Sequence, residues 1–143
     1  MDQQDYDILK VYLAQMDSAI KISEKICNHS DREEINGDDI ICGLVYRLMR
    51  PMSDNEIQDS LSKADTILND EYDSEDNDEE DIMISYEKSK VLRKIKSNHC
   101  NCDICSDVRV CLLNYHDHDP NDQLSQRFKN SIKETCQKHN LYI

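Results

Sequence analysis

Three cysteines lie within six residues near the middle of the C-terminal half, a spacing that ordinary packing does not require. They are Cys100, Cys102 and Cys105, and His99 stands beside them. Free thiols this close together oxidise readily unless something occupies the sulfurs, and a Cys-x-x-Cys turn can direct two thiolates at one metal ion. The pattern therefore predicts a metal site, and zinc is the metal we expect there.

A structural zinc ion takes four protein ligands in a tetrahedron, so a fourth ligand must come from elsewhere in the chain. Cys136 and His139 lie three residues apart on a predicted C-terminal helix, which places them on one face of it. We expect either Cys136 or His139 to join the three clustered cysteines, and the sequence does not choose between them. His116 and His118 are outside candidates in a polar loop, where we expect them to be solvated.

Two alternatives to a metal site also fit the cysteine pattern, a redox-active pair and unliganded core thiols. Cys102 and Cys105 could form a redox-active dithiol, although no strand–helix–strand context predicts a thioredoxin-like fold. All of the cysteines could also be unliganded thiols in a small core. The His-x-Glu motif of zinc deaminases, Gly-rich phosphate loops and the Gly-x-Ser-x-Gly elbow are missing, and a RING-type ligase needs more ligands. We therefore predict no catalytic residues and a protein that is not an enzyme.

Charge is unevenly distributed along the chain, whose net charge is −13 over 143 residues. Residues 69–81 contain nine acids and no base, which predicts a disordered acidic linker. The basic stretch at residues 88–96 carries five cations, and a helix there could contact nucleic acid. Because the aromatic residues that stack on bases are missing from it, we favour a solvated helix face instead.

Hydrophobic spacing before the linker predicts three helices, which would pack as a small N-terminal bundle. The first has apolar residues at alternating steps of three and four, and the second is apolar over a broad face. The third opens with Ser53 and Glu56, which fit a capping box. His29 falls in the loop after the first helix, where we expect an exposed residue. The predicted helices span residues 5–28, 38–50 and 53–68.

After the linker the pattern predicts further helices. We expect a helix over residues 86–97 with Val91, Leu92 and Ile95 facing inward. The last helix should be capped by Asp119 and have Pro120 at its first position, with an apolar stripe that runs to Cys136. Between them, residues 108–115 fit either a strand or a helical turn, and we expect Cys111 to be buried there.

The predicted architecture is therefore mainly α, with a helical N-terminal domain at residues 1–68, the linker at 69–81, and a zinc-binding helical domain at 82–143. No run approaches the ~18 apolar residues of a membrane span, and the N-terminus has no signal-peptide pattern. The odd number of cysteines also argues against a disulfide framework. We expect a soluble cytoplasmic protein that acts by binding a protein partner through a zinc-stabilised scaffold.

The composition is rich in Ile, Asn, Asp, Lys and Tyr around a lean, cysteine-bearing core. In this amino-acid composition the chain resembles the small proteins of large nucleocytoplasmic DNA viruses of the mimivirus kind. The resemblance extends over the whole chain and includes no catalytic motif. It implies a viral protein that acts in the host cytoplasm or is carried in the virion.

Overall fold

The structure, a computed structural model, describes residues 2–69 and 91–143 and is mainly helical, as the sequence predicts. Nearly all of the predicted linker at residues 69–81 lies outside the described residues, and so do positions 86–90 of the predicted basic helix. The described elements are α1 (Gln3–Asn28), α2 (Gly37–Met49), α3 (Asp54–Asn69), β1 (Arg93–Lys94), α4 (Asp103–Asn114), the 3₁₀ turn η2 (Tyr115–Asp117), α5 (Gln123–Lys138) and β2 (Leu141–Tyr142).

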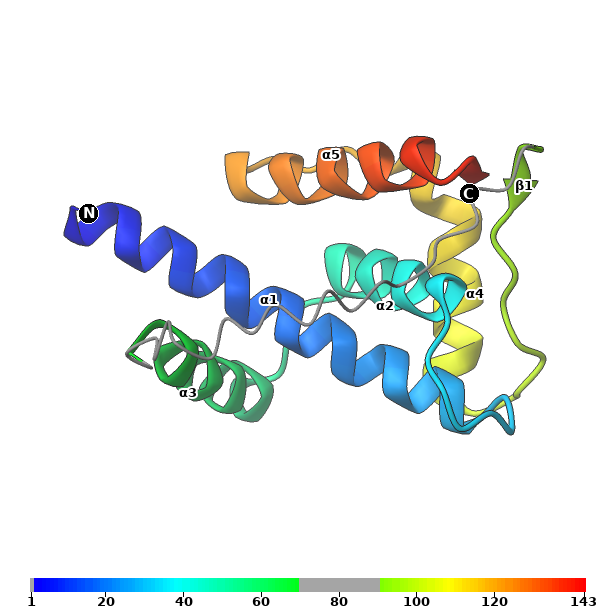
Figure 1. Cartoon of the computed structure of the whole chain (residues 1–143), viewed down its shortest axis with the longest axis horizontal. Helices are drawn as coiled ribbons and strands as arrows, with labels where there is room; N and C mark the ends of the chain where they lie inside the picture. Colours follow the sequence, from blue (N-terminus) through cyan, green and yellow to red (C-terminus); the bar gives the residue numbers. More distant parts are fainter. Residues whose placement is uncertain (1, 70–90) are drawn as a thin grey trace, which may run out of the picture.

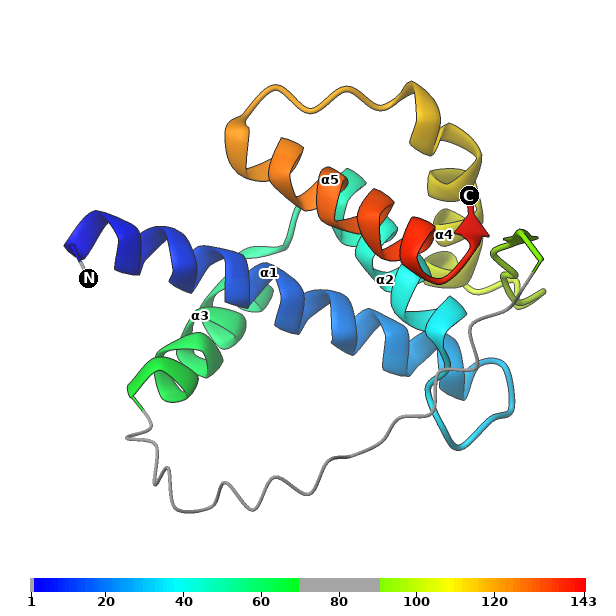
Figure 2. The same ribbon diagram turned by 45° about the horizontal axis from the view of Figure 1, so that its top comes forward.

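The long helix α1 runs through the molecule and packs against both α2 and α3 (Figure 1). Helix α2 in turn packs against α4 and α5, so it contacts helices from both ends of the sequence. In the turned view, α3 and α2 lie on opposite sides of α1 (Figure 2). Helix α2 is therefore a main link between the N-terminal and C-terminal helices, and Tyr12 of α1 adds a direct contact with Phe128 of α5.

A single hydrophobic cluster includes residues from both halves of the chain. Apolar side chains at regular helical spacing on α1 and α2 meet those of α4 and α5, which removes their surface from water. The predicted domain boundaries at residues 68 and 82 stay predictions, but the helices on either side of the linker share this core. Its fully buried members include Val45, Val108, Cys111, Phe128 and Ile132.

Helices α1 and α2 approach closely because α2 carries a glycine at the contact. A Cβ atom placed on Gly43 would lie 2.2 Å from Ser23 Oγ and 2.4 Å from the backbone oxygen of Ala19. Real Cβ atoms do not come this near to backbone oxygens, so a larger residue would push the helices apart. The absence of a side chain at Gly43 thus sets how α1, and the residue at its end, sits against α2.

Helix starts follow the sequence pattern at α2 and α3. Asn36 and Asp39 form a reciprocal capping box on α2. Ser53 and Glu56 form the capping box on α3 that the sequence predicts. The start of α5 differs from the prediction, because Asp122 rather than Asp119 caps it and accepts the Ser125 N–H at 2.9 Å. Several nearby side chains can cap this helix, and the loop geometry selects the last of them.

Residues 91–97 contain no helix and include the short strand β1, which corrects the predicted helix over this part of 86–97. Strand β1 pairs in parallel with β2, and Arg93 stands opposite Leu141. Val91 is 72% exposed and Leu92 is 62% exposed, so only Ile95, at 7%, faces inward as expected. Local periodicity favoured a helix, but pairing with the distant C-terminal strand satisfies the backbone of this segment instead.

An acidic side chain at the start of α2 fixes the extended segment. Arg93 donates two hydrogen bonds to the Asp38 carboxylate at 2.8 Å, and the Lys96 N–H donates a third at 2.9 Å. Burial acts to raise the pKa of Asp38, but these donors outweigh it and hold the pKa below its usual value. These hydrogen bonds fix residues 93–96, and the cysteine-rich loop that follows them lies beside the end of α1.

Candidate metal centre

The structure brings the three clustered cysteines together with His29. The ligand atoms of His29, Cys100, Cys102 and Cys105 all lie within 4.8 Å of one another. His29 Nδ1 lies 3.3 Å from Cys100 Sγ and 3.1 Å from Cys102 Sγ. Across the residues that the structure describes, this is the one group of histidine, cysteine and acidic side chains with metal-binding geometry.

His29 is positioned by the end of α1. It is the C-cap residue, and its backbone N–H donates to the carbonyl oxygens of Lys25 and Cys27. The chain then turns sharply, with Asp31 in the left-handed region at φ 56° and the Arg32 N–H bonded to the Cys27 carbonyl oxygen. This turn ends the helix and leaves the exposed His29 at the edge of the molecule, next to the cysteine loop.

The cysteines are positioned by the start of α4. Cys102 is the N-cap residue of α4, and the Cys105 N–H donates to Cys102 Sγ at 3.3 Å. The Cys102 N–H donates in turn to Cys100 Sγ at 3.5 Å, so the loop curls around its own sulfurs. Cys105 is buried, whereas Cys100 and Cys102 are half-buried. The site therefore has one side against the core and one side near solvent.

The sulfurs of Cys102 and Cys105 differ in acidity. The backbone N–H of Cys105 lowers the pKa of Cys102 to about 7, because a hydrogen bond from a helix N-terminus stabilises the thiolate. Burial raises the pKa of Cys105 to about 11, since its thiolate would lose solvation. A metal cation reverses that penalty, because a coordinated thiol deprotonates and its charge is matched by the ion.

Asn98 links the site to its surroundings. Its side-chain Nδ2 donates to Cys105 Sγ at 3.2 Å and to Ser30 Oγ at 3.1 Å, just past the end of α1. Its Oδ1 accepts the Cys100 N–H at 3.3 Å, and Arg109 of α4 donates to its backbone oxygen at 3.0 Å. One amide thus holds the cysteine loop, α1 and α4 together, which is how second-sphere residues orient metal ligands.

The four side chains fit zinc in ligand type and in separation. Three sulfurs and one imidazole nitrogen form a Cys₃His set, a common set for structural zinc. Zn–S bonds of about 2.3 Å and Zn–N bonds of about 2.0 Å place tetrahedral sulfur and nitrogen ligands roughly 3.6 Å apart. The N···S distances of 3.1 and 3.3 Å are a few tenths of an ångström shorter, so a small expansion accommodates the ion.

Neither of the two fourth ligands proposed from the sequence joins this group. Cys136 is 6% exposed and packs in the hydrophobic core, where burial raises its pKa. His139 is the C-cap of α5, and its N–H donates to carbonyl oxygens of that helix. Cys111 is buried in the core, as predicted. Zinc held by the three cysteines and His29 would therefore leave Cys136 and His139 in structural roles.

Sequence reasoning missed His29 because it lies 71 residues before Cys100. The sequence correctly predicts that His29 is exposed, but exposure alone does not mark a ligand. One signal was present: His29 is the one histidine among residues 1–98 and stands directly after a long amphipathic helix. A histidine fixed at a helix end is better placed to bind a metal than one in a loose loop.

Two further observations concern the chain beyond the cluster. No helix within residues 2–69 and 91–143 combines the length and apolar character that crossing a membrane requires. Searches of protein-family models, curated proteins and solved structures find no match to the chain. The chemistry of the four clustered side chains is therefore the basis for a functional assignment.

Proposed function

We propose that this chain is a non-enzymatic interaction or scaffold protein in which a structural zinc ion is bound by Cys100, Cys102, Cys105 and His29. The observation that supports it is the meeting of four nitrogen and sulfur ligands from two distant segments. A site with four protein ligands leaves no open position for substrate or activated water, which is the usual difference between structural and catalytic zinc. The proposed zinc therefore acts on the fold.

The position of the site explains what the zinc would stabilise. His29 belongs to the end of α1, whereas the cysteines belong to the loop before α4 and to its first turn. Zinc at this point would add a direct cross-link between two segments that the side chain of Asn98 already joins by hydrogen bonds. Such an ion binds the folded state and not the unfolded one, so its binding free energy adds to stability.

The direct test is the metal content of protein purified without added zinc, combined with thermal melts before and after treatment with a chelator. We expect one zinc per chain and a clear fall in melting temperature on chelation. His29→Ala should lose the metal, whereas His139→Ala and Cys136→Ala should keep it, even if the latter is less stable. Absence of metal from the wild-type protein and from protein refolded with zinc would refute the site.

The second candidate function is a thiol oxidoreductase that uses Cys102 and Cys105. The observation in its favour is that the sulfurs of Cys102 and Cys105 lie within 4.8 Å of each other at the start of α4. The Cys105 N–H there also lowers the pKa of Cys102 to about 7. This function predicts a reversible disulfide between the two residues in metal-free protein and thiol-dependent reduction of insulin that Cys102→Ser abolishes. Tightly bound zinc that resists mild oxidants would argue against it.

The nucleic-acid alternative has less support in the described residues. Arg93 is engaged by Asp38, so Lys94 and Lys96 are the exposed cations that remain from residues 91–96. This function predicts that the protein is retained on DNA or RNA and that retention falls as the salt concentration rises. Lys94→Ala and Lys96→Ala should each weaken the retention. The protein partner and the cytoplasmic or virion location stay predictions.

A further inference from the structure

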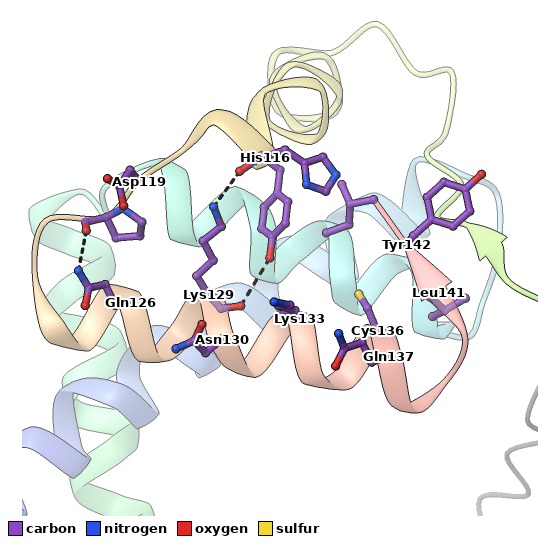
Figure 3. A pocket seen from close by; sticks show the side chains of 13 residues that line it. His116, Asp119, Gln126, Lys129, Asn130, Lys133, Cys136, Gln137, Leu141 and Tyr142 are labelled. Carbon is purple, nitrogen blue, oxygen red and sulfur yellow. Dashed lines mark hydrogen bonds between the residues drawn. The ribbon is translucent and has the colours of Figure 1, made fainter.

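A pocket of about 590 Å³ lies at the opposite end of α4 from the metal centre. It is bounded by α5, by η2 with the loop that follows it, and by the residues of β2 and Ile143 (Figure 3). Its volume falls in the range of small-molecule sites. Nothing in the zinc-based scaffold requires this pocket, so its chemistry can be considered independently.

One face of α5 supplies most of the polar lining. Each of Gln126, Lys129, Asn130, Lys133 and Gln137 lies three or four positions from another member of the set, so they share that face. The other walls are largely apolar and come from distant segments that the fold brings over α5. They include Tyr115, Pro120, Leu141 and Ile143. The pocket thus offers a polar strip beside an apolar wall, a combination suited to an amphipathic ligand.

Some of the polar groups are already used by the fold. Lys129 Nζ donates to the carbonyl oxygens of Tyr115 and His118, and Gln126 Nε2 donates to the Pro120 oxygen at 3.1 Å. These bonds hold the loop over α5, as the dashed lines in Figure 3 show in part. The side chains of Lys133, Asn130 and Gln137 make no hydrogen bond or ion pair with any residue that the structure describes, so they are available to a ligand.

The charge of the lining favours an anion. The chain as a whole carries −13, yet two lysines and one acid, Asp119, line this pocket. Lys129 is held by neutral carbonyl groups, so its charge is not cancelled by a carboxylate. With one free ammonium at Lys133 and with Asp119 nearby, a single negative charge fits better than the double charge of a phosphate.

We propose that this pocket binds a small monocarboxylate with an apolar body. Lys133 and the side-chain amides of Asn130 and Gln137 receive the carboxylate through charge-assisted and neutral hydrogen bonds. The body of the ligand lies against Tyr115, Leu141 and the other apolar walls. Binding at this end of α4 does not require zinc, so the failure of either proposal leaves the other intact.

The test is a titration of ¹⁵N-labelled full-length protein with 4-phenylbutyrate, followed by two-dimensional NMR. We expect the side-chain amide signals of Asn130 and Gln137 to shift and saturate. Lys133→Gln should raise the dissociation constant about tenfold, the usual effect of losing one charged hydrogen bond. Lys138→Gln on the same helix, outside the pocket, is the matched control and should leave the dissociation constant unchanged.

Two further ligands distinguish recognition of the carboxylate from non-specific binding of hydrophobic molecules. The methyl ester of 4-phenylbutyrate keeps the apolar body without the charge, and 4-phenylbutylamine reverses the charge. Both should bind at least tenfold more weakly than the acid. Equal binding of acid and ester, equal effects of the two lysine substitutions, or no saturable shift at the pocket amides would each overturn the proposal.

Discussion

Helix α1 takes part in two contacts of opposite kinds. In its middle, Ser23 and Ala19 meet Gly43 of α2 in an interface that depends on shape, with no room for one added methyl group. At its end, His29 meets three cysteines in a cluster of nitrogen and sulfur ligands, of which Cys105 is buried and His29 is exposed. The first contact needs nothing from outside the chain, whereas the proposed second contact is complete only with a metal ion.

The difference shows two ways in which a lean chain can hold distant segments together. Close packing stabilises by removing apolar surface from water and by dispersion, and it tolerates no added volume. A metal cluster stabilises through a few strong bonds and tolerates a polar, exposed surrounding. Four substitutions, each with a matched control, distinguish the two kinds of contact.

The largest loss of stability should come from replacing a cysteine of the metal cluster, compared with replacing a cysteine of the hydrophobic core. Cys105→Ser should abolish metal binding and remove the stabilisation it supplies, about 4 kcal/mol when free zinc is 1,000-fold above its dissociation constant. Cys111→Ser, the matched control, buries a hydroxyl in the core and should lose only about 1–3 kcal/mol while keeping its metal. Urea unfolding with and without zinc measures both. Equal zinc content in the two variants would contradict the assignment.

The next effect belongs to the packed contact. Gly43→Ala should destabilise the fold by about 2 kcal/mol, because the overpacking penalty exceeds the helix propensity that alanine gains. Gly37→Ala is the control, since a Cβ there meets nothing within 4 Å, and it should be neutral or slightly stabilising. Chemical denaturation of the zinc-bound forms compares them. If Gly43→Ala proved as stable as Gly37→Ala, the close approach of α1 and α2 would be wrong.

A smaller effect is expected from Asn98, which supports the cluster without being a ligand. Asn98→Ala removes the hydrogen bonds to Cys105 and Ser30 and should weaken zinc affinity roughly tenfold while leaving one zinc per chain. Competition with a chromophoric chelator measures that affinity. The neighbouring Ser97→Ala should leave it unchanged, and an equal loss in both variants would indicate a general loosening of the loop.

The smallest effect is a pH dependence at Asp38, whose pKa is lowered in the fold by Arg93 and the Lys96 N–H against the opposing effect of burial. A lowered carboxyl pKa contributes stability above the unfolded value near 3.8 and loses it as pH falls through the folded value. Asp38→Asn should therefore cost about 1 kcal/mol at neutral pH, with the gap to wild type closing in the acid range below about pH 4.

The control for that prediction is Asp59→Asn, on the exposed face of α3. Its stability difference from wild type should stay near zero at both pH values, since exposed carboxylates outside ion pairs contribute little. Urea unfolding at pH 7 and in the acid range measures all three proteins. A gap between Asp38→Asn and wild type that is the same at both pH values would show that the carboxylate acts through shape and not through charge.

Local sequence signals predicted much of the helical structure. The capping box at Ser53 marks the start of α3 within a residue, because a cap and its partner lie three positions apart and need no tertiary contact. The same reasoning failed over residues 91–97. There, Asp38 and the C-terminal strand impose an extended conformation that local periodicity does not encode.

Residue spacing along the chain was enough to indicate the mainly helical class. It also identified the three clustered cysteines as the candidate centre of metal chemistry. Which side chain completes the candidate cluster depends on the fold. The C-terminal helix offered Cys136 and His139 at suitable spacing, but the close packing of α1 on α2 carries His29 to the cysteine loop, while Cys136 is buried in the core. Ligand identity depends on the meeting of distant segments in space, and no local pattern records that meeting.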